Sequence, residues 1–242
     1  MTLLPDAEKN PPRFLSPSLP ARPQAIPAIS CPRRDYRAWR TWQDVGKAIR
    51  GLPVVTMGQA WREADEDALM PSAVAVAHHQ DELIIYAEMA DADIFNPVRE
   101  HGAHAYQRGD VFEIFLRPEG AENYFEHHVT PDNFTLQLSF PTLTAFGEYC
   151  SSDPDWARPL MTSIPVPSRV LAQPEIETWR VLAIVPLTSI VPAGKAVPND
   201  WRFSFCRYDY THGREKPVLS STTPCPFANF HHQERWGRLT LD

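Results

Sequence analysis

The sequence predicts an all-β protein, a β-sandwich or jelly roll of two antiparallel sheets joined by long proline-rich loops. Short apolar segments that alternate with a period of two recur along the chain, as they do in half-buried strands. Strong helical periodicity is almost absent. The chain also has 25 prolines against 10 glycines, and proline suits strand edges and connections rather than helix interiors. Many short strands without βαβ alternation favour a sandwich.

The chain divides into two regions by composition. Residues 1–30 predict a proline-rich N-terminal extension, in which the stretch 11–27 reads as extended chain on the surface of the domain. Residues 31–242 predict one β-sandwich domain, because 43% of the chain is hydrophobic and 11% is aromatic, enough for a substantial core.

The predicted elements follow in chain order. Residues 35–52 predict a short helix or an irregular loop, and residues 59–69 predict one or two helical turns or an acidic loop. Clear apolar runs are few between 141 and 174. The predicted strands cover 72–79, 82–94, 110–118, the two halves of 123–140 around a turn at 131–133, 177–187, 200–210 and 235–241.

Charge and composition exclude several classes of function. A net charge of -7 and an isoelectric point near 5.7 argue against a nucleic-acid partner, which needs a basic surface. No apolar run approaches the roughly 20 residues that span a bilayer, so no membrane partner is expected. The N-terminus lacks the basic start and apolar stretch of a signal peptide. The chain as given therefore reads as cytoplasmic, although a chain trimmed of its leader would look the same.

The four cysteines are far apart in the sequence and form no C-x-x-C motif, which disfavours a zinc knuckle. A domain of this length does not need disulfides for stability, so we expect free thiols.

One predicted strand carries a carboxylate in an apolar setting. In the strand 110–118, one face is wholly apolar, while the other carries Glu113 between Val111 and Phe115. A solvated face would usually carry Thr, Lys or Ser at this position. Glu113 is therefore a candidate functional residue.

Catalysis is disfavoured by the absence of recognisable motifs. The sequence has no nucleophile elbow, P-loop, dinucleotide-binding glycine motif or H-E-x-x-H. Paired carboxylates occur at Asp91 with Asp93 and at Asp110 with Glu113, and such pairs can hydrolyse glycosides when they flank a substrate. They more often cap loops or bind calcium, so we expect no enzyme activity.

The sequence offers candidate ligands for zinc and for calcium. Three adjacent histidine pairs occur, but neighbours on a strand point to opposite faces, so no pair can bind one zinc ion by itself. The pairs are His78-His79, His127-His128 and His231-His232. Oxygen ligands suit calcium, and Asp91, Asp93 and Asn96 stand close together at a predicted strand end. A structural calcium site and a plain polar loop are equally consistent with these three residues.

Sugar binding needs flat aromatic rings and charged or amide groups for the hydroxyls. The strand 200–210 has three rings and then Arg207 on one face, and two tyrosines on the other. The rings are Trp201, Phe203 and Phe205, with Tyr208 and Tyr210 opposite. Alternatively, the rings belong to the core and Arg207 pairs with a carboxylate such as Glu113.

The order of several segments resembles the family 9 carbohydrate-binding modules and the larger family-9-like group, loosely related to the DOMON domains. The resemblance extends from about Trp61 to Leu241. Its segments are "AWREAD", "DELIIYAEMADADI", "RGDVFEIFLRP", "YFEHHVTPDN", "WRVLAIVPLTSI", "DWRFSFCRYDY" and "FHHQERWGRLTL". Within them, the most specific are Gly109-Asp110 with Glu113, Trp201-Arg202 with Arg207, and Phe230-His231 followed by Trp236-Gly237.

The resemblance implies a non-catalytic β-sandwich, often with structural calcium, that binds glycan ends between two aromatic rings. It places Glu113 at the position of a sugar-contacting acid and Arg207 at that of a polar contact. The usual tryptophans are replaced by Gln107 and Leu219. Tyrosines at 106, 208 and 210 can substitute for the missing rings.

These inferences lead to one geometric expectation, that Glu113 and Arg207 emerge together on an accessible sheet surface that binds a saccharide. Two alternatives stay open. A haem-binding electron-transfer domain of the DOMON type would use axial ligands from Met57, Met70 or Met89 and a histidine. A protein-interaction module would present an exposed apolar patch.

Overall fold

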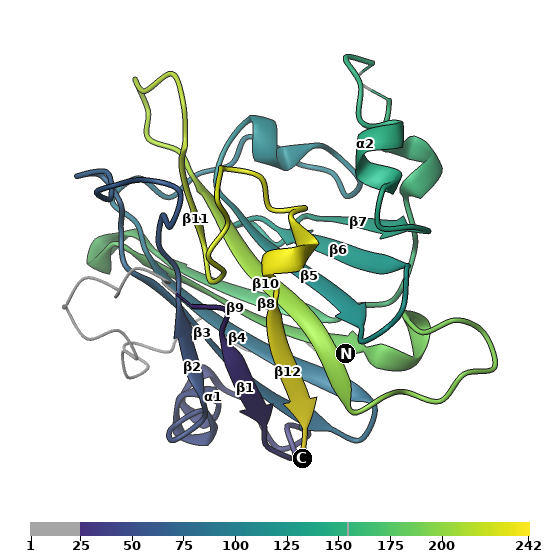
Figure 1. The fold of residues 1–242 in the computed structure, drawn as a ribbon. Helices are drawn as coiled ribbons and strands as arrows, with labels where there is room; N and C mark the ends of the chain where they lie inside the picture. Colours follow the sequence, from purple (N-terminus) through teal and green to yellow (C-terminus); the bar gives the residue numbers. More distant parts are fainter. Residues whose placement is uncertain (1–24, 154) are drawn as a thin grey trace.

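Two β-sheets pack face to face in the computed structural model, which describes residues 25–153 and 155–242 (Figure 1). The larger sheet has seven strands and the smaller has five. The larger sheet contains β1 (Ala28–Cys31), β5 (Val111–Pro118), β6 (Tyr124–Val129), β7 (Thr135–Phe140), β10 (Asp200–Asp209), β11 (Val218–Ser221) and β12 (Gly237–Leu241). The smaller contains β2 (Val54–Thr56), β3 (Ser72–His79), β4 (Glu82–Ala90), β8 (Ser168–Gln173) and β9 (Thr178–Pro186). The predicted all-β sandwich is confirmed.

Helices are short and connect or cover the strands. They are α1 (Trp42–Ala48), α2 (Ala145–Tyr149) and the 3-10 turns η1 (Ala105–Gln107), η2 (Arg158–Leu160), η3 (Pro174–Ile176), η4 (Leu187–Ser189) and η5 (Gln233–Arg235). Thr41 and Asp44 form a reciprocal capping box that begins α1. The acidic segment 59–69 forms a loop and not helical turns. No helix in the described part of the chain is long and apolar enough to span a membrane.

The strand order of the larger sheet is β1-β12-β10-β5-β6-β7, with β11 also paired to β10. That of the smaller sheet is β2-β3-β4-β9-β8. All these pairs are antiparallel except β1 with β12, which run parallel. The strand β1 begins at Ala28, inside the predicted N-terminal extension, so the end of that region belongs to the sheet. Residues 1–24 of the extension lie outside the described residues.

The main core lies between the two sheets. On β5, Phe112, Ile114 and Leu116 face inward, and β10 adds Phe203 and Phe205 beside them. Each of these five side chains is fully buried, because the period of a strand puts alternate residues on one face. We call this side of the larger sheet its inner face and the opposite side its outer face. The predicted aromatic face of strand 200–210 is therefore core.

The outer face of the larger sheet is also buried over β5, β6 and β7. A second apolar cluster there contains Phe115, Tyr124, Leu136 and Phe140, packed beneath residues from the segments after β7 and β11. In Figure 1 the segment between β11 and β12 passes in front of the sheet, and the segment that contains α2 stands beside β7. This double burial explains why a carboxylate on the outer face need not be solvated.

The predicted free thiols are confirmed, since all four cysteines are unpaired. Three of them, Cys31, Cys206 and Cys225, are buried, and Cys150 is exposed.

Candidate functional site

Glu113 lies near the middle of β5 and points to the outer face of the larger sheet. The strand register places His128 of β6 opposite it on one side and Cys206 of β10 on the other. The Glu113 side chain is only 2% exposed, and its Oε1 lies 3.2 Å from His128 Nε2. Glu113 therefore stands on the predicted face, but beneath covering side chains and not in open solvent.

Arg207 lies on the opposite face of the same sheet. Its register partner on β5 is Phe112, which points into the core, whereas Glu113 is paired with Cys206. A shift of one residue along a strand reverses the face. The expectation that Glu113 and Arg207 emerge together was wrong. The alternative, with the rings in the core and Arg207 paired with a carboxylate, is confirmed, although the partners are Asp91 and Asp209 and not Glu113.

The Arg207 guanidinium is a buried structural cation. Its Nη2 lies 2.9 Å from Asp91 Oδ2 and 3.1 Å from Asp209 Oδ2. Its Nη1 donates hydrogen bonds to Ser72 Oγ and to the carbonyl oxygen of Ala90. With 1% of its surface exposed, Arg207 cannot reach a ligand on the surface.

Two buried residues of β6, Glu126 and His128, complete the outer-face site around Glu113. The sequence indicated His128 only as one of an adjacent histidine pair and did not indicate Glu126. His128 Nε2 lies 2.5 Å from Glu126 Oε1, so one imidazole bridges the carboxylates of Glu113 and Glu126. His231, from the segment before β12, approaches the other Glu126 oxygen, with its Nε2 3.7 Å from Oε2. The available signal was the spacing Glu126-x-His128, which puts both side chains on the face of Glu113.

Burial and mutual attraction perturb all four groups. Burial raises the pKa of Glu113 to about 8 and lowers the pKa of His231 to about 4. Burial also opposes charge on Glu126 and His128, but their neighbours outweigh it. His231 and His128 hold the pKa of Glu126 below its usual value, and Glu113 and Glu126 hold that of His128 above its usual value. The cluster therefore favours an ionised Glu126 beside a protonated His128.

A line of aromatic side chains runs over this cluster, and we call it the aromatic rim. Its half-buried members are Trp61, His104, Tyr106, Phe146, Trp156 and Tyr208. Tyr106 is central, since its ring lies 5.5 Å from that of Tyr208, 5.8 Å from that of His104 and 5.7 Å from that of His128. The line continues from His104 to Trp156 and Phe146, with centroid separations of 5.8 and 5.9 Å.

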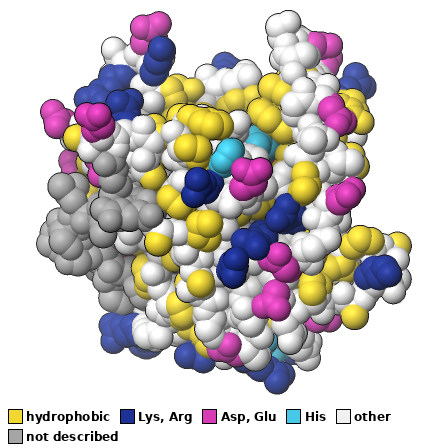
Figure 2. Space-filling view, viewed as in Figure 1, with side chains coloured by type: hydrophobic (Ala, Val, Ile, Leu, Met, Phe, Trp, Pro, Cys, Tyr) yellow, Lys and Arg dark blue, Asp and Glu magenta, His cyan; other side chains and the backbone are white. Residues whose placement is uncertain are grey.

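The surface above the outer face combines apolar and polar groups. Figure 2 shows histidine side chains (cyan) between hydrophobic side chains (yellow) on this face, with charged groups beside them. Gln107 is exposed, and its Nε2 donates a hydrogen bond to Tyr106 Oη at 3.1 Å. Leu219, the second residue at a usual tryptophan position, packs against the outer-face cluster instead.

The predicted ligand residues thus divide into two sets. Tyr106, Gln107 and Tyr208 lie on or beside the aromatic rim, where the two tyrosines are half-buried and Gln107 is exposed. Tyr210 supports the rim, because its hydroxyl donates to the carbonyl oxygen of Tyr106 at 2.9 Å. A ligand cannot reach Glu113 while the rim holds this position.

The three predicted calcium ligands all accept hydrogen bonds from groups of the protein. Asp91 accepts hydrogen bonds from Arg207 and from the backbone N–H of Asp93. Asp93 accepts from the backbone and ring of His212, and Asn96 accepts from the N–H of Val98. Calcium takes six to eight oxygen ligands, so an ion here would have to compete with these protein donors, and the calcium site stays a prediction.

Asp91 also belongs to a buried trio with Asp110 and Asp209, whose oxygens lie within 4.8 Å of one another. Arg207 supplies the positive charge there. Burial and the charge of Asp91 raise the pKa of Asp110 to about 8, and burial raises that of Asp209 to about 6. This arrangement is suited to holding β4 against β10.

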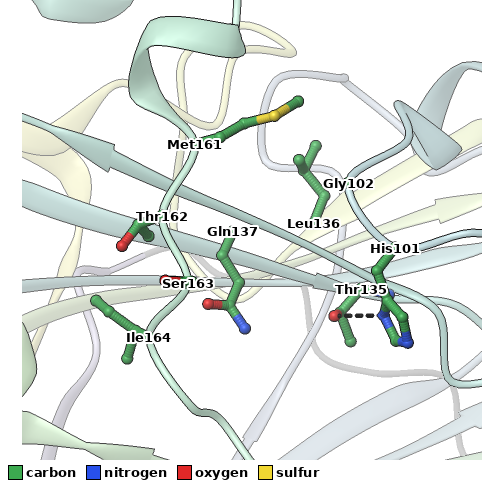
Figure 3. Close-up of a pocket in the computed structure, with 9 residues that line it drawn as sticks. All are labelled: His101, Gly102, Thr135, Leu136, Gln137, Met161, Thr162, Ser163 and Ile164. Atoms are coloured by element: carbon green, nitrogen blue, oxygen red, sulfur yellow. Dashed lines mark hydrogen bonds between the residues drawn. The ribbon is translucent and has the colours of Figure 1, made fainter.

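A separate cleft of about 300 Å³ lies at the β7 edge of the larger sheet (Figure 3). His101 Nδ1 lies 3.0 Å from Thr135 Oγ1 at one end, and Gln137 lies between Thr135 and Ser163. None of the predicted site residues lines this cleft. It offers a matched position for control substitutions.

Two of the three methionines predicted as possible haem ligands, Met57 and Met89, lie in the core. Met57 and Met89 are fully buried in the core between the sheets, among aliphatic side chains. Neither offers an open axial position.

Comparison of the fold with solved structures identifies similar sandwiches. The chain is similar to a Bacteroides uniformis protein assigned only provisionally as carbohydrate-binding, with a TM-score of 0.67 and 14% identity over 90% of this chain and 100% of that chain. It is also similar to a family 9 carbohydrate-binding module from Caldicellulosiruptor kristjanssonii in complex with glucose. That match has a TM-score of 0.58 and 14% identity, and covers 89% of this chain and 95% of that chain.

The same kind of module from Caldicellulosiruptor kristjanssonii in complex with cellotriose gives a TM-score of 0.56 and 13% identity, over 89% of this chain and 93% of that chain. No protein-family model matches the sequence, and no curated protein is similar to it. The chain therefore has a family-9-like fold, as its sequence predicted, and identities of this size establish the fold alone.

Proposed function

We propose that this protein is a non-catalytic carbohydrate-binding module whose saccharide contacts the aromatic rim. The carrying observation is the continuous line of half-buried rings on the outer face of the larger sheet, centred on Tyr106. Sugar C–H groups stack on such rings, and the exposed amide of Gln107 can hydrogen-bond to hydroxyls. The similar fold of modules crystallised with glucose and with cellotriose supports this choice of ligand class.

We infer that the ligand is the end of a glycan and not the middle of a long chain. The rim ends at covering segments, since its members Trp156 and Phe146 belong to the region after β7, and Phe230, from the region before β12, contacts Tyr208. A short saccharide end fits between such segments more readily than a chain that must pass along a flat sheet.

Binding is tested by a glycan array followed by calorimetric titration with glucose, with cellotriose and with the strongest array ligand. We expect Tyr106→Ala to weaken binding about tenfold, equivalent to about 1.4 kcal/mol, because a stacking ring is lost. Tyr106→Phe should bind nearly as well as the wild type, since it keeps the ring. Gln107→Ala should weaken binding by a smaller factor.

Thr135→Ala, in the β7-edge cleft, is the control and should leave the affinity unchanged. Borohydride reduction of the ligand's reducing end separates recognition of that end from recognition of internal units. No binding to any glycan on the array, or equal affinity of the wild type and Tyr106→Ala for the ligand, would contradict the proposal.

A further inference from the structure

The buried cluster beneath the aromatic rim has the composition of a metal site. Glu113, Glu126 and His128 each offer one ligand atom, and these atoms lie within 4.8 Å of one another. His231 adds a fourth donor, with its Nε2 3.7 Å from Glu126 Oε2. Ligand atoms around a tetrahedral zinc ion are about 3.4 Å apart, given Zn–N and Zn–O distances of about 2.0–2.2 Å.

Among the described residues, the two buried acids of the cluster have only histidines as ion-pair partners. Two carboxylates are buried side by side, with 2% and 4% of Glu113 and Glu126 exposed. Within the described part of the chain, neither forms an ion pair with a lysine or an arginine. The buried acids Asp91 and Asp209 differ from them, because both form ion pairs with Arg207.

One oxygen in the cluster is left without a donor. Glu126 Oε2 is buried and has no hydrogen-bond partner, although Oε1 of the same side chain is bound by His128. A buried carboxylate oxygen in this state carries a desolvation cost that a bound cation would remove. The orphaned oxygen faces the His231 ring, so the unfilled position lies between Glu126 and His231.

Neighbouring side chains hold the His231 ring in an orientation that suits a metal ligand. Its Nδ1 lies 3.0 Å from Tyr124 Oη, and Phe146 stacks on the ring with centroids 3.6 Å apart. When Nδ1–H donates to the tyrosine oxygen, Nε2 is left as the acceptor on the side of Glu126. Fixing the far nitrogen of a ligating histidine is the usual way in which proteins orient such ligands.

We propose that Glu113, Glu126 and His128, with His231 as fourth ligand, bind one divalent transition-metal ion of the zinc type. The mixture of imidazole and carboxylate donors suits zinc and its neighbours better than calcium, which prefers oxygen alone. The ion would replace the direct contact between His128 Nε2 and Glu126 Oε1. The site is enclosed, so the ion would tie β5 and β6 to the segment before β12.

The test uses the full chain, stripped with a chelator and titrated with ZnCl₂ by calorimetry in the absence of any saccharide. We expect one ion per chain, a melting temperature that rises on addition of zinc, and the visible absorption of tetrahedral cobalt when CoCl₂ is used instead. Glu126→Gln should weaken zinc binding at least a hundredfold, and His231→Gln about tenfold. Both variants should lose the zinc-dependent rise in melting temperature.

His232→Gln is the matched control, because this neighbouring histidine contacts Glu234 and lies outside the cluster. It should bind zinc as the wild type does. Should Glu126→Gln fail to fold, Glu113→Gln serves in its place, with at least a tenfold loss expected. No saturable binding of zinc, or equal zinc affinity in the wild type, Glu126→Gln and His231→Gln, would overturn the proposal. The outcome does not depend on sugar binding, which is measured separately.

Discussion

At the scale of single residues, two charges of this sheet have different roles because of the face on which they stand. Arg207 faces inward, where it neutralises Asp91 and Asp209. Glu113 faces outward, where His128 is its charged partner. The sequence singled out both residues, Glu113 as a carboxylate between apolar residues and Arg207 as a charge at the end of a row of aromatic rings. It could not predict their faces relative to each other, because pairing register is set by contacts between distant segments.

Removing the Arg207 charge should therefore destabilise the fold. We expect Arg207→Ala to lower the free energy of unfolding by about 3–5 kcal/mol, because it leaves buried carboxylates without a counter-charge. Urea denaturation measures this change. Saccharide affinity, measured below the unfolding transition, should be nearly unaltered. A stable variant that has lost its affinity for sugar would instead support a ligand role for Arg207.

Asp110 should make stability depend on pH. Asp91, Asp209 and Arg207 face it, and its pKa is raised to about 8 from 3.8. Above pH 4 the unfolded chain has lost this proton while the folded chain keeps it. The stability that Asp110 contributes is thus complete below pH 4 and is lost as the pH rises through about 8.

Glu113 and His128 also have raised pKa values and titrate in the same range, so the contribution of Asp110 is isolated by comparison with Asp110→Asn. The free energy of unfolding should fall between pH 6.5 and 8.5, and one such group contributes at most about 1.4 kcal/mol per pH unit. In Asp110→Asn the free energy of unfolding should fall less steeply with pH, whatever the stability of this variant at low pH. Identical slopes in the two proteins would show that Asp110 is ionised in the native state.

At the scale of elements, strands with strong alternation were predictable and weakly patterned ones were not. The predicted strand at 72–79 agrees with β3, and the turn between β6 and β7 occurs where Pro131–Asn133 indicated it, with Asn133 at a φ of 63°. The strands β1, β2, β8 and β11 were missed. They have at most six residues and lie at sheet edges, so pairing with a neighbour determines them more than their own pattern does.

The start of β12 depends on a close approach that only glycine permits. A Cβ atom on Gly237 would lie 2.5 Å from Phe203 Cε1 and 2.9 Å from Pro27 Cγ. Because Phe203 is fully buried, Gly237→Ala should cost about 1–3 kcal/mol of stability. Gly147→Ala is the control, since nothing lies within 4 Å of its added Cβ and it sits in α2. Equal melting temperatures for the two variants would contradict the close contact.

At the scale of the whole molecule, the larger sheet is buried on both faces over β5, β6 and β7. The smaller sheet covers the inner face, and loops from four regions cover the outer face and bring Trp61, Tyr106, Trp156 and Phe230 together. The sandwich was predictable from strand patterns and from the resemblance to family 9. The aromatic rim was not, because its members come from irregular segments whose relative positions no local pattern specifies.

The location of the saccharide is the central claim, and it is tested most directly by nuclear magnetic resonance. The indole N–H signals of the seven tryptophans are assigned and followed while the strongest array ligand is added. We predict that the signals of Trp156 and Trp61, on the aromatic rim, shift and saturate, while those of the buried Trp179 and Trp201 stay in place. Saturating binding that leaves Trp156 and Trp61 unmoved would contradict a saccharide site on the outer face.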